Sequence, residues 1–195
     1  LPLRQDQLDI RGHALEARIY AENPEQDFLP STGRLLHLAR PAESLNVRVD
    51  TGFEQGDEIT PYYDPMIAKL IVWDVDRHAA LARMRQALAD YRIVGVVNNI
   101  GFLSRLVACP AYANADLDTG LIERSRALLF PLPSEPPNSV FFVAAVAGLL
   151  REQAAASARA SQSGDPWSPW SRHDGWRLNL QPRRTLTYRC GDSRH

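Results

Sequence analysis

Residues 61–73 read PYYDPMIAKLIVW, and this stretch decides how the chain folds. Its second part, residues 66–73, is a nearly continuous apolar run with β-branched members, which is typical of a strand buried in a sheet. Asp76 follows and can cap a helix, because its carboxylate can accept hydrogen bonds from free amides of the first helical turn. Beyond it, apolar residues recur at helical spacing at Leu81, Met84, Leu88 and Tyr91. The stretch therefore predicts a buried strand followed by an amphipathic helix.

Two segments upstream alternate between apolar and polar residues, as strands with one buried face do. They are residues 13–21, which could also pass for a helix, and residues 45–50. The turn residues PSTG at 30–33 precede a further expected strand at 34–39, because proline fixes φ and glycine permits a positive φ. We therefore expect an α+β fold over residues 1–127, an antiparallel sheet with packed helices.

Shorter elements are expected after the amphipathic helix. They are a strand near Ile93, a turn at Gly95 and a helix over residues 99–107, which we expect Pro110 to end. Thr119 is expected to cap another short helix.

The last third of the chain has a different organisation. Residues 128–165 contain a proline-rich connector, a long apolar and alanine-rich helix over 139–160, and the start of a linker. Alternation at 176–180 and 186–190 then indicates two strands. We expect residues 166–195 to be the incomplete start of a further β domain, since two strands are too few for a stable sheet.

Composition excludes several classes of function. The chain has 195 residues, 45% of them hydrophobic and 23% charged, and a net charge of −1. These are ordinary values for a globular protein, and no basic surplus suggests a nucleic-acid partner. The most apolar run, residues 140–150, is short for a membrane span, so we expect a soluble chain with no membrane partner. Cys109 and Cys190 match no metal spacing and are expected to be reduced.

Four stretches, in order, resemble the C-terminal domain of biotin carboxylases. Together they cover roughly residues 10–125 and include GHALEARI with AENP, then FLPSTG, then VRVD with PYYDPMIAKL, and finally ARM with a later NN pair. The resemblance implies an enzyme that uses ATP and bicarbonate to carboxylate a ureido nitrogen of biotin. In the family, the phosphate-binding lysines, the glycine-rich loop and the Mg²⁺ carboxylates precede this domain. The sole lysine, Lys69, cannot replace them, so we expect an inactive segment of a longer enzyme.

Arg48 is the candidate catalytic and biotin-binding residue. The alternation of the VRVD strand alone places the guanidinium of Arg48, a planar and permanently charged donor, on the polar face of the strand. There it could stabilise negative charge that develops on an oxygen during a reaction. An ion pair with Asp50 or Glu16 is the alternative that strand position alone favours. The resemblance implies instead that Arg48 contacts the biotin ureido oxygen and supports its enolate-like form. No metal ligand is expected.

Other polar residues receive structural interpretations. His13 has the chemistry of an acid–base group, but its place at a strand start favours a structural hydrogen bond. Glu16 and Arg18 lie two apart on one strand face and are expected to form a polar brace. In the YYDP turn the tyrosines are expected to be buried, and Asp64 is expected to bind backbone amides.

The tail carries a second resemblance. Residues 167–179, with WSPW and DGWRLN, resemble the linking domain of acyl-CoA carboxylase α subunits, most closely of the methylcrotonoyl-CoA carboxylase type. This implies a carboxyltransferase β subunit and the biotinyl domain of the same subunit as partners, in a bacterial cytoplasmic enzyme.

In simpler family enzymes subunits meet around Trp73 and Arg77. We expect at most weak self-association here, with a buried core role as the alternative for Trp73. A propionyl-, acetyl- or geranyl-CoA enzyme, or a non-catalytic docking segment, remain alternatives.

Overall fold

The protein is described from a computed structural model that covers residues 2–132, 135–164, 167–168, 184–190 and 193–194. The backbone divides into two compact units, Leu1–Leu132 and Pro133–His195.

A three-stranded antiparallel sheet forms the centre of the first unit. Its strands are β1 (His13–Tyr20), β8 (Met66–Asp74) and β6 (Val47–Thr51), in the order β1-β8-β6. The apolar run that was predicted to be a buried strand is therefore the middle strand, paired on both sides. Leu70 and Val72 of β8 are fully buried on one face of the sheet.

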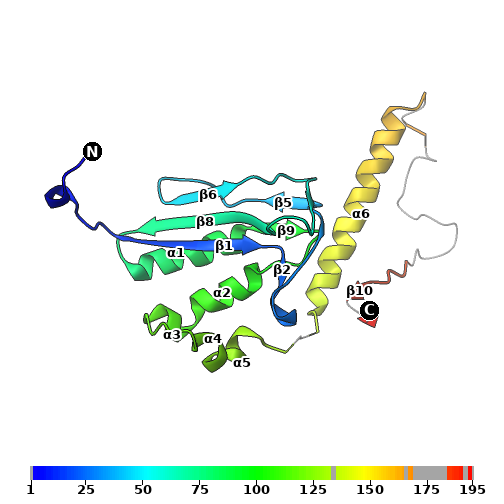
Figure 1. The fold of residues 1–195 in the computed structure, drawn as a ribbon. Coiled ribbons are helices and arrows are strands. Elements are labelled where there is room, and N and C mark those ends of the chain that lie inside the picture. The colour runs from blue at the N-terminus through cyan, green and yellow to red at the C-terminus, as the bar shows by residue number, and fades with distance from the viewer. Residues whose placement is uncertain (1, 133–134, 165–166, 169–183, 191–192, 195) are drawn as a thin grey trace. The chain divides into compact units, whose positions relative to one another are not determined.

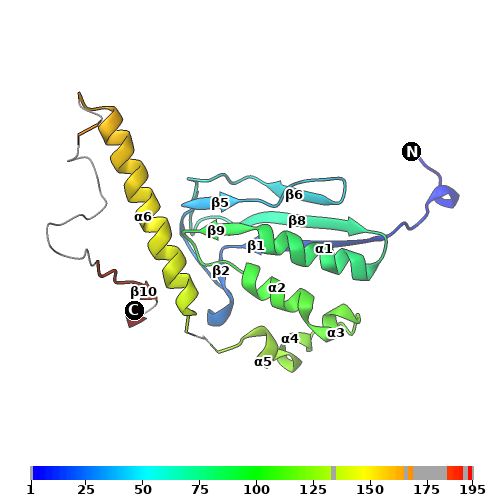
Figure 2. The ribbon, with the colours of Figure 1, turned by 180° about the vertical axis from the view of Figure 1, so that it is seen from behind.

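One face of this sheet is covered by helices. Figures 1 and 2 show α1 (Arg77–Asp90) along β8, with α2 (Ile100–Ala108) beside it. Asp76 caps α1 as predicted, because its carboxylate accepts a 2.8 Å hydrogen bond from the amide of Ala79. The stripe of α1 that was read from the sequence is buried against the sheet, at Leu81, Met84, Leu88 and, just past the helix, Tyr91. The expected α+β fold is confirmed.

Short strands and helices surround this centre. The two-stranded pairs are β2 (Glu22–Asn23) with β3 (Leu29–Pro30), β4 (Gly33–Arg34) with β7 (Glu58–Ile59), and β5 (His37–Ala39) with β9 (Arg92–Val94). The short helices are η1 (Gln5–Gln7), η2 (Pro24–Gln26), α3 (Pro110–Ala113), α4 (Leu121–Arg124) and α5 (Arg126–Leu129).

Of four local predictions, those for Pro110 and Asp64 were confirmed and those for Thr119 and the two tyrosines were wrong. Pro110 does follow the end of α2, but it also begins α3, where a fixed φ and a missing amide are tolerated. The N-cap of α4 is Gly120 rather than Thr119, and no side chain caps the helix. Tyr62 and Tyr63 are 92% and 84% exposed, because the turn before β8 runs over the surface. Asp64 does bind a backbone amide, that of Met66, at 2.9 Å.

The second unit contains α6 (Asn138–Ser161) and the strand pair β10 (Arg189–Cys190) and β11 (Ser193–Arg194). The helix agrees with the one predicted at 139–160, whereas the predicted strand at 176–180 lies outside the described residues. By length and composition α6 could cross a membrane, with a mean hydropathy of 1.3 and 6% of its apolar window buried. The apolar part of this helix is therefore longer than the run at 140–150 on which the sequence-based expectation rested. One such helix does not establish a span, since core helices meet the same criteria.

Candidate functional site

The face of the sheet opposite α1 carries charged side chains at its centre. Because side chains alternate along strands, the register brings together one row of Arg18, Lys69 and Asp50 and a second row of Glu16, Ile71 and Arg48. We call the set Glu16, Arg18, Arg48, Asp50 and Lys69 the charged face.

Arg48 forms a two-point ion pair with Asp50. Its Nε and Nη2 atoms each donate to one carboxylate oxygen of Asp50, both at 3.0 Å. The two side chains are 66% and 47% exposed. Of the two partners expected from the sequence, Asp50 is the one used. In the described part of the chain, Nη1 of Arg48 has no hydrogen-bond partner, so this end of the guanidinium is open to a ligand oxygen.

Glu16 and Arg18 form a similar ion pair on β1, with one hydrogen bond in place of two. Arg18 Nε donates to Glu16 at 3.1 Å, and this hydrogen bond raises the pKa of Arg18. Each carboxylate on the charged face therefore accepts hydrogen bonds from the arginine of its own strand. The pair has the geometry of the polar brace that the sequence predicts.

Lys69 lies on the middle strand, between the two pairs. It is opposite Arg18 on one side and Asp50 on the other. Within residues 2–132 its ammonium forms no ion pair. A shallow hollow of about 230 Å³ opens beside it and is lined by Asp50, Thr51, Gly52 and residues 66–69.

His13 has the structural role expected for it. Nη1 of Arg77 lies 3.2 Å from His13 Nε2, and because a guanidinium can only donate, the imidazole accepts. Arg77 also donates to the carbonyls of Tyr112 and Ala113, at 2.5 and 3.3 Å. His13 thus belongs to a contact that ties β1 to the start of α1 and the end of α3.

Asn99 is a structural residue whose role the sequence did not reveal. Its side chain is buried, accepts from the amide of Tyr20 at 2.9 Å and donates to the carbonyl of Arg18 at 3.0 Å. Its own amide donates to the carbonyl of Tyr20 at 3.2 Å. The NN pair in the fourth motif was the only signal, and it does not indicate a partner some 80 residues away.

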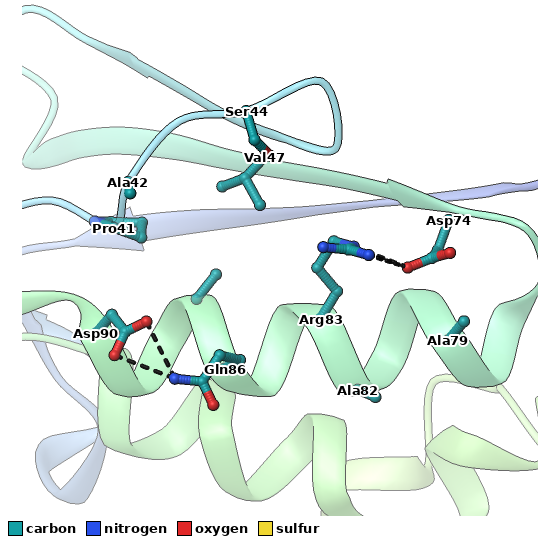
Figure 3. A pocket seen from close by; sticks show the side chains of 11 residues that line it. Pro41, Ala42, Ser44, Val47, Asp74, Ala79, Ala82, Arg83, Gln86 and Asp90 are labelled. Atoms are coloured by element: carbon teal, nitrogen blue, oxygen red, sulfur yellow. Dashed lines mark hydrogen bonds and ion pairs between the residues drawn. The ribbon is translucent and has the colours of Figure 1, made fainter.

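A larger groove, of about 480 Å³, lies on the other face of the sheet (Figure 3). Its polar groups largely pair with one another, since Arg83 contacts Asp74 at 2.6 Å and Gln86 donates to Asp90. The amide of Val75 and then Arg83 lower the pKa of Asp74. The groove lies on the side of Val47, whereas the next residue, Arg48, points to the opposite face. It is therefore separate from the charged face.

Neither a metal site nor a disulfide is found among the described residues. No three His, Cys, Asp or Glu side chains gather closely enough there to hold a metal ion. Both cysteines are free, Cys109 buried and Cys190 exposed.

Trp73 is 39% exposed at the end of β8, and its Nε1 donates to the carbonyl of Arg11 at 2.9 Å. It lies outside the core, which removes the alternative of a buried role.

The fold and the motifs together define a C-terminal domain of a biotin carboxylase. The family model described as the biotin carboxylase C-terminal domain matches residues 16–124, more than half of the chain, and the chain belongs to this family.

Two curated relatives of this chain are subunits of acyl-CoA carboxylases. The chain is 44% identical over 194 residues to the mitochondrial methylcrotonoyl-CoA carboxylase subunit alpha of Dictyostelium discoideum. That alignment covers 100% of this chain and 27% of the relative. The human mitochondrial propionyl-CoA carboxylase alpha chain is 46% identical over 121 residues, which cover 60% of this chain and 17% of the relative. The chain therefore spans about a quarter of the first relative's length.

A solved structure supports the fold. The biotin carboxylase domain dimer of Hydrogenobacter thermophilus 2-oxoglutarate carboxylase, in complex with MgADP, ADP and bicarbonate, superimposes with a TM-score of 0.65. It is 34% identical, and the match covers 69% of this chain and 29% of that chain.

Proposed function

We propose that this segment completes the biotin site of a biotin carboxylase within an acyl-CoA carboxylase α subunit, and that Arg48 binds the ureido oxygen of biotin. The observation that carries the proposal is the exposed guanidinium of Arg48, held by Asp50 with its Nη1 end open. It lies in the VRVD motif of a family whose name specifies biotin carboxylation.

The open guanidinium fits a carbonyl-type oxygen. Biotin supplies the ureido nitrogen that accepts the carboxyl group, and negative charge develops on the ureido oxygen as that nitrogen reacts. A preorganised cationic donor stabilises such charge more strongly in the transition state than in the ground state. Arg48 can act in this way without accepting or releasing a proton, because a guanidinium stays charged. Its contribution is to hold and stabilise one oxygen.

ATP and Mg²⁺ are assigned to other parts of the full-length subunit. Lys69 is the sole lysine here, and it lies on the charged face rather than in a phosphate-binding loop. We therefore expect the 195-residue chain alone to release no ADP when supplied with MgATP, bicarbonate and biotin. A coupled ADP assay measures this, with a complete α subunit as the positive control. Biotin- and bicarbonate-dependent ADP release from the purified chain would show that it holds its own nucleotide site.

The proposed acyl substrate is 3-methylcrotonoyl-CoA. It is supported by the match over the whole chain to a methylcrotonoyl-CoA carboxylase subunit alpha, whereas the propionyl-CoA carboxylase match covers 60% of the chain. An α subunit carrying this segment, assembled with its β subunit, should carboxylate methylcrotonoyl-CoA with a higher kcat/KM than propionyl-, acetyl- or geranyl-CoA. A bicarbonate-fixation assay with the four thioesters decides, and preference for another thioester refutes the substrate assignment but leaves the biotin site untouched.

A docking role is the second candidate, and α6 favours it. Large apolar side chains of this helix are exposed, among them Phe142 at 72% and Val143 at 69%. Such a surface is typical of a helix that another chain or domain covers. We propose the carboxyltransferase β subunit and the biotinyl domain of the same subunit as the full-length partners.

Self-association of the segment is expected to be at most weak. A tight dimer in sedimentation that Trp73→Ala abolishes would contradict this.

A further inference from the structure

We infer that Asp50 is the positioning residue of Arg48, fixing which end of the guanidinium faces the ligand. This inference rests on the proposed function of Arg48. Asp50 occupies the Nε and Nη2 edge with two hydrogen bonds of 3.0 Å, the arrangement in which a guanidinium and a carboxylate match in shape. The remaining Nη1 end is then the part of the group that is presented to a ligand oxygen.

The register leaves Asp50 as the carboxylate partner that Arg48 has in the described part of the chain. On the adjacent strand β8, the residue opposite Arg48 is Ile71, which has no polar group to hold the guanidinium. The carboxylate in the same row, Glu16, is engaged by Arg18 instead. Because Arg48 and Asp50 are two apart on one strand, they share a face without any adjustment of the backbone.

Orientation, more than fold stability, is what this pair can supply. Both side chains are about half exposed or more, and exposed ion pairs contribute little to folding. An unrestrained arginine samples many rotamers, so few of its conformations would place Nη1 at the ureido oxygen. Asp50 limits these conformations before the ligand arrives, which raises the rate when the oxygen must be met in one geometry.

The test compares single and double variants in a full-length α subunit that carries this segment. Asp50→Asn keeps the size of the side chain but loses the charge and the two-point pair, and should lower kcat for biotin carboxylation about 10- to 100-fold. Asp50→Glu restores a carboxylate and should recover part of that rate. In an Arg48→Lys background, Asp50→Asn should change kcat by less than about threefold, because the residue it positions is already lost.

Glu16→Gln is the matched control, because it weakens the ion pair that Arg18 forms with Glu16 on the other outer strand, β1. It should leave kcat within about twofold of the parent, and melting temperatures check that each variant is folded. If Asp50→Asn keeps or raises the rate while Arg48→Lys is slow, the positioning role is wrong and the proposed function stands. A loss that Asp50→Asn causes equally in both backgrounds also overturns it. If Arg48→Lys is not slow, the proposed function fails and the inference fails with it. Should Asp50→Asn not fold, Asp50→Glu in the two backgrounds decides by the same comparison.

Discussion

Replacing Arg48 by lysine in a full-length α subunit should slow biotin carboxylation about 100- to 1000-fold, the loss typical of removing one preorganised donor to a developing oxyanion. Lysine keeps the positive charge but has no planar fork. It can pair with Asp50 only as a point charge, so the open Nη1 end described above disappears. The binding of ATP should change far less, since no described contact links Arg48 to a phosphate-binding group.

Stability separates this role from a simple surface ion pair. Arg48 and Asp50 are exposed, and such pairs contribute about 0–1 kcal/mol to folding, so the melting temperature should barely move. Arg18→Lys is the matched control, because Arg18 pairs with Glu16 through one hydrogen bond on β1, on the other side of β8. The measurement is the carboxylation rate beside the melting temperature of each variant. A folded Arg48→Lys protein with a rate within about threefold of the parent would exclude Arg48 as a site residue.

Gly95→Ala should have a large effect on folding, lowering the free energy of unfolding by about 3 kcal/mol or more. Gly95 follows β9 with φ of +118°, a conformation that side chains rarely adopt. A Cβ at this position would overlap the carbonyl oxygen of Arg34 and lie 2.9 Å from the amide nitrogen of Leu36. Both neighbours are backbone atoms, so they cannot move aside without disturbing the pairing of β5 with β9.

Gly52→Ala is the control for this substitution. Apart from its two chain neighbours, no residue has a heavy atom within 4 Å of the Cβ that it would introduce, so its effect should stay within about 0.5 kcal/mol. Denaturant unfolding of the 195-residue chain measures both variants. If Gly95→Ala and Gly52→Ala unfold at the same denaturant concentration, the close approach of residues 34–36 to residue 95 is not required for the fold.

The elements that the sequence predicted best are those whose own residues determine them. β8 is a run of apolar residues, and α1 has a helical apolar stripe and a capping Asp76, so local pattern and final fold agree. The order β1-β8-β6 was not predicted, because it depends on contacts between residues far apart in the chain. The exposed Tyr62 and Tyr63 were missed because aromatic residues next to a buried strand resemble core residues.

The candidate site was predictable in type but not in detail. Strand alternation placed Arg48 on a polar face, and the family resemblance suggested its ligand. Its partner stayed open between Asp50 and Glu16, because choosing between them required the register across β8. Asn99 was missed for the same reason, since its hydrogen bonds are to the distant strand β1.

The contacts of Asn99 also cover backbone groups on the outer edge of β1. β1 is an outer strand of the sheet, and the edge that does not pair with β8 would present free amides and carbonyls to a strand of another molecule. Asn99 occupies three of these groups, the carbonyl of Arg18 and both backbone groups of Tyr20. The side chain and the backbone amide of Asn99 thus leave fewer unpaired backbone groups at this end of β1, where another strand could otherwise add.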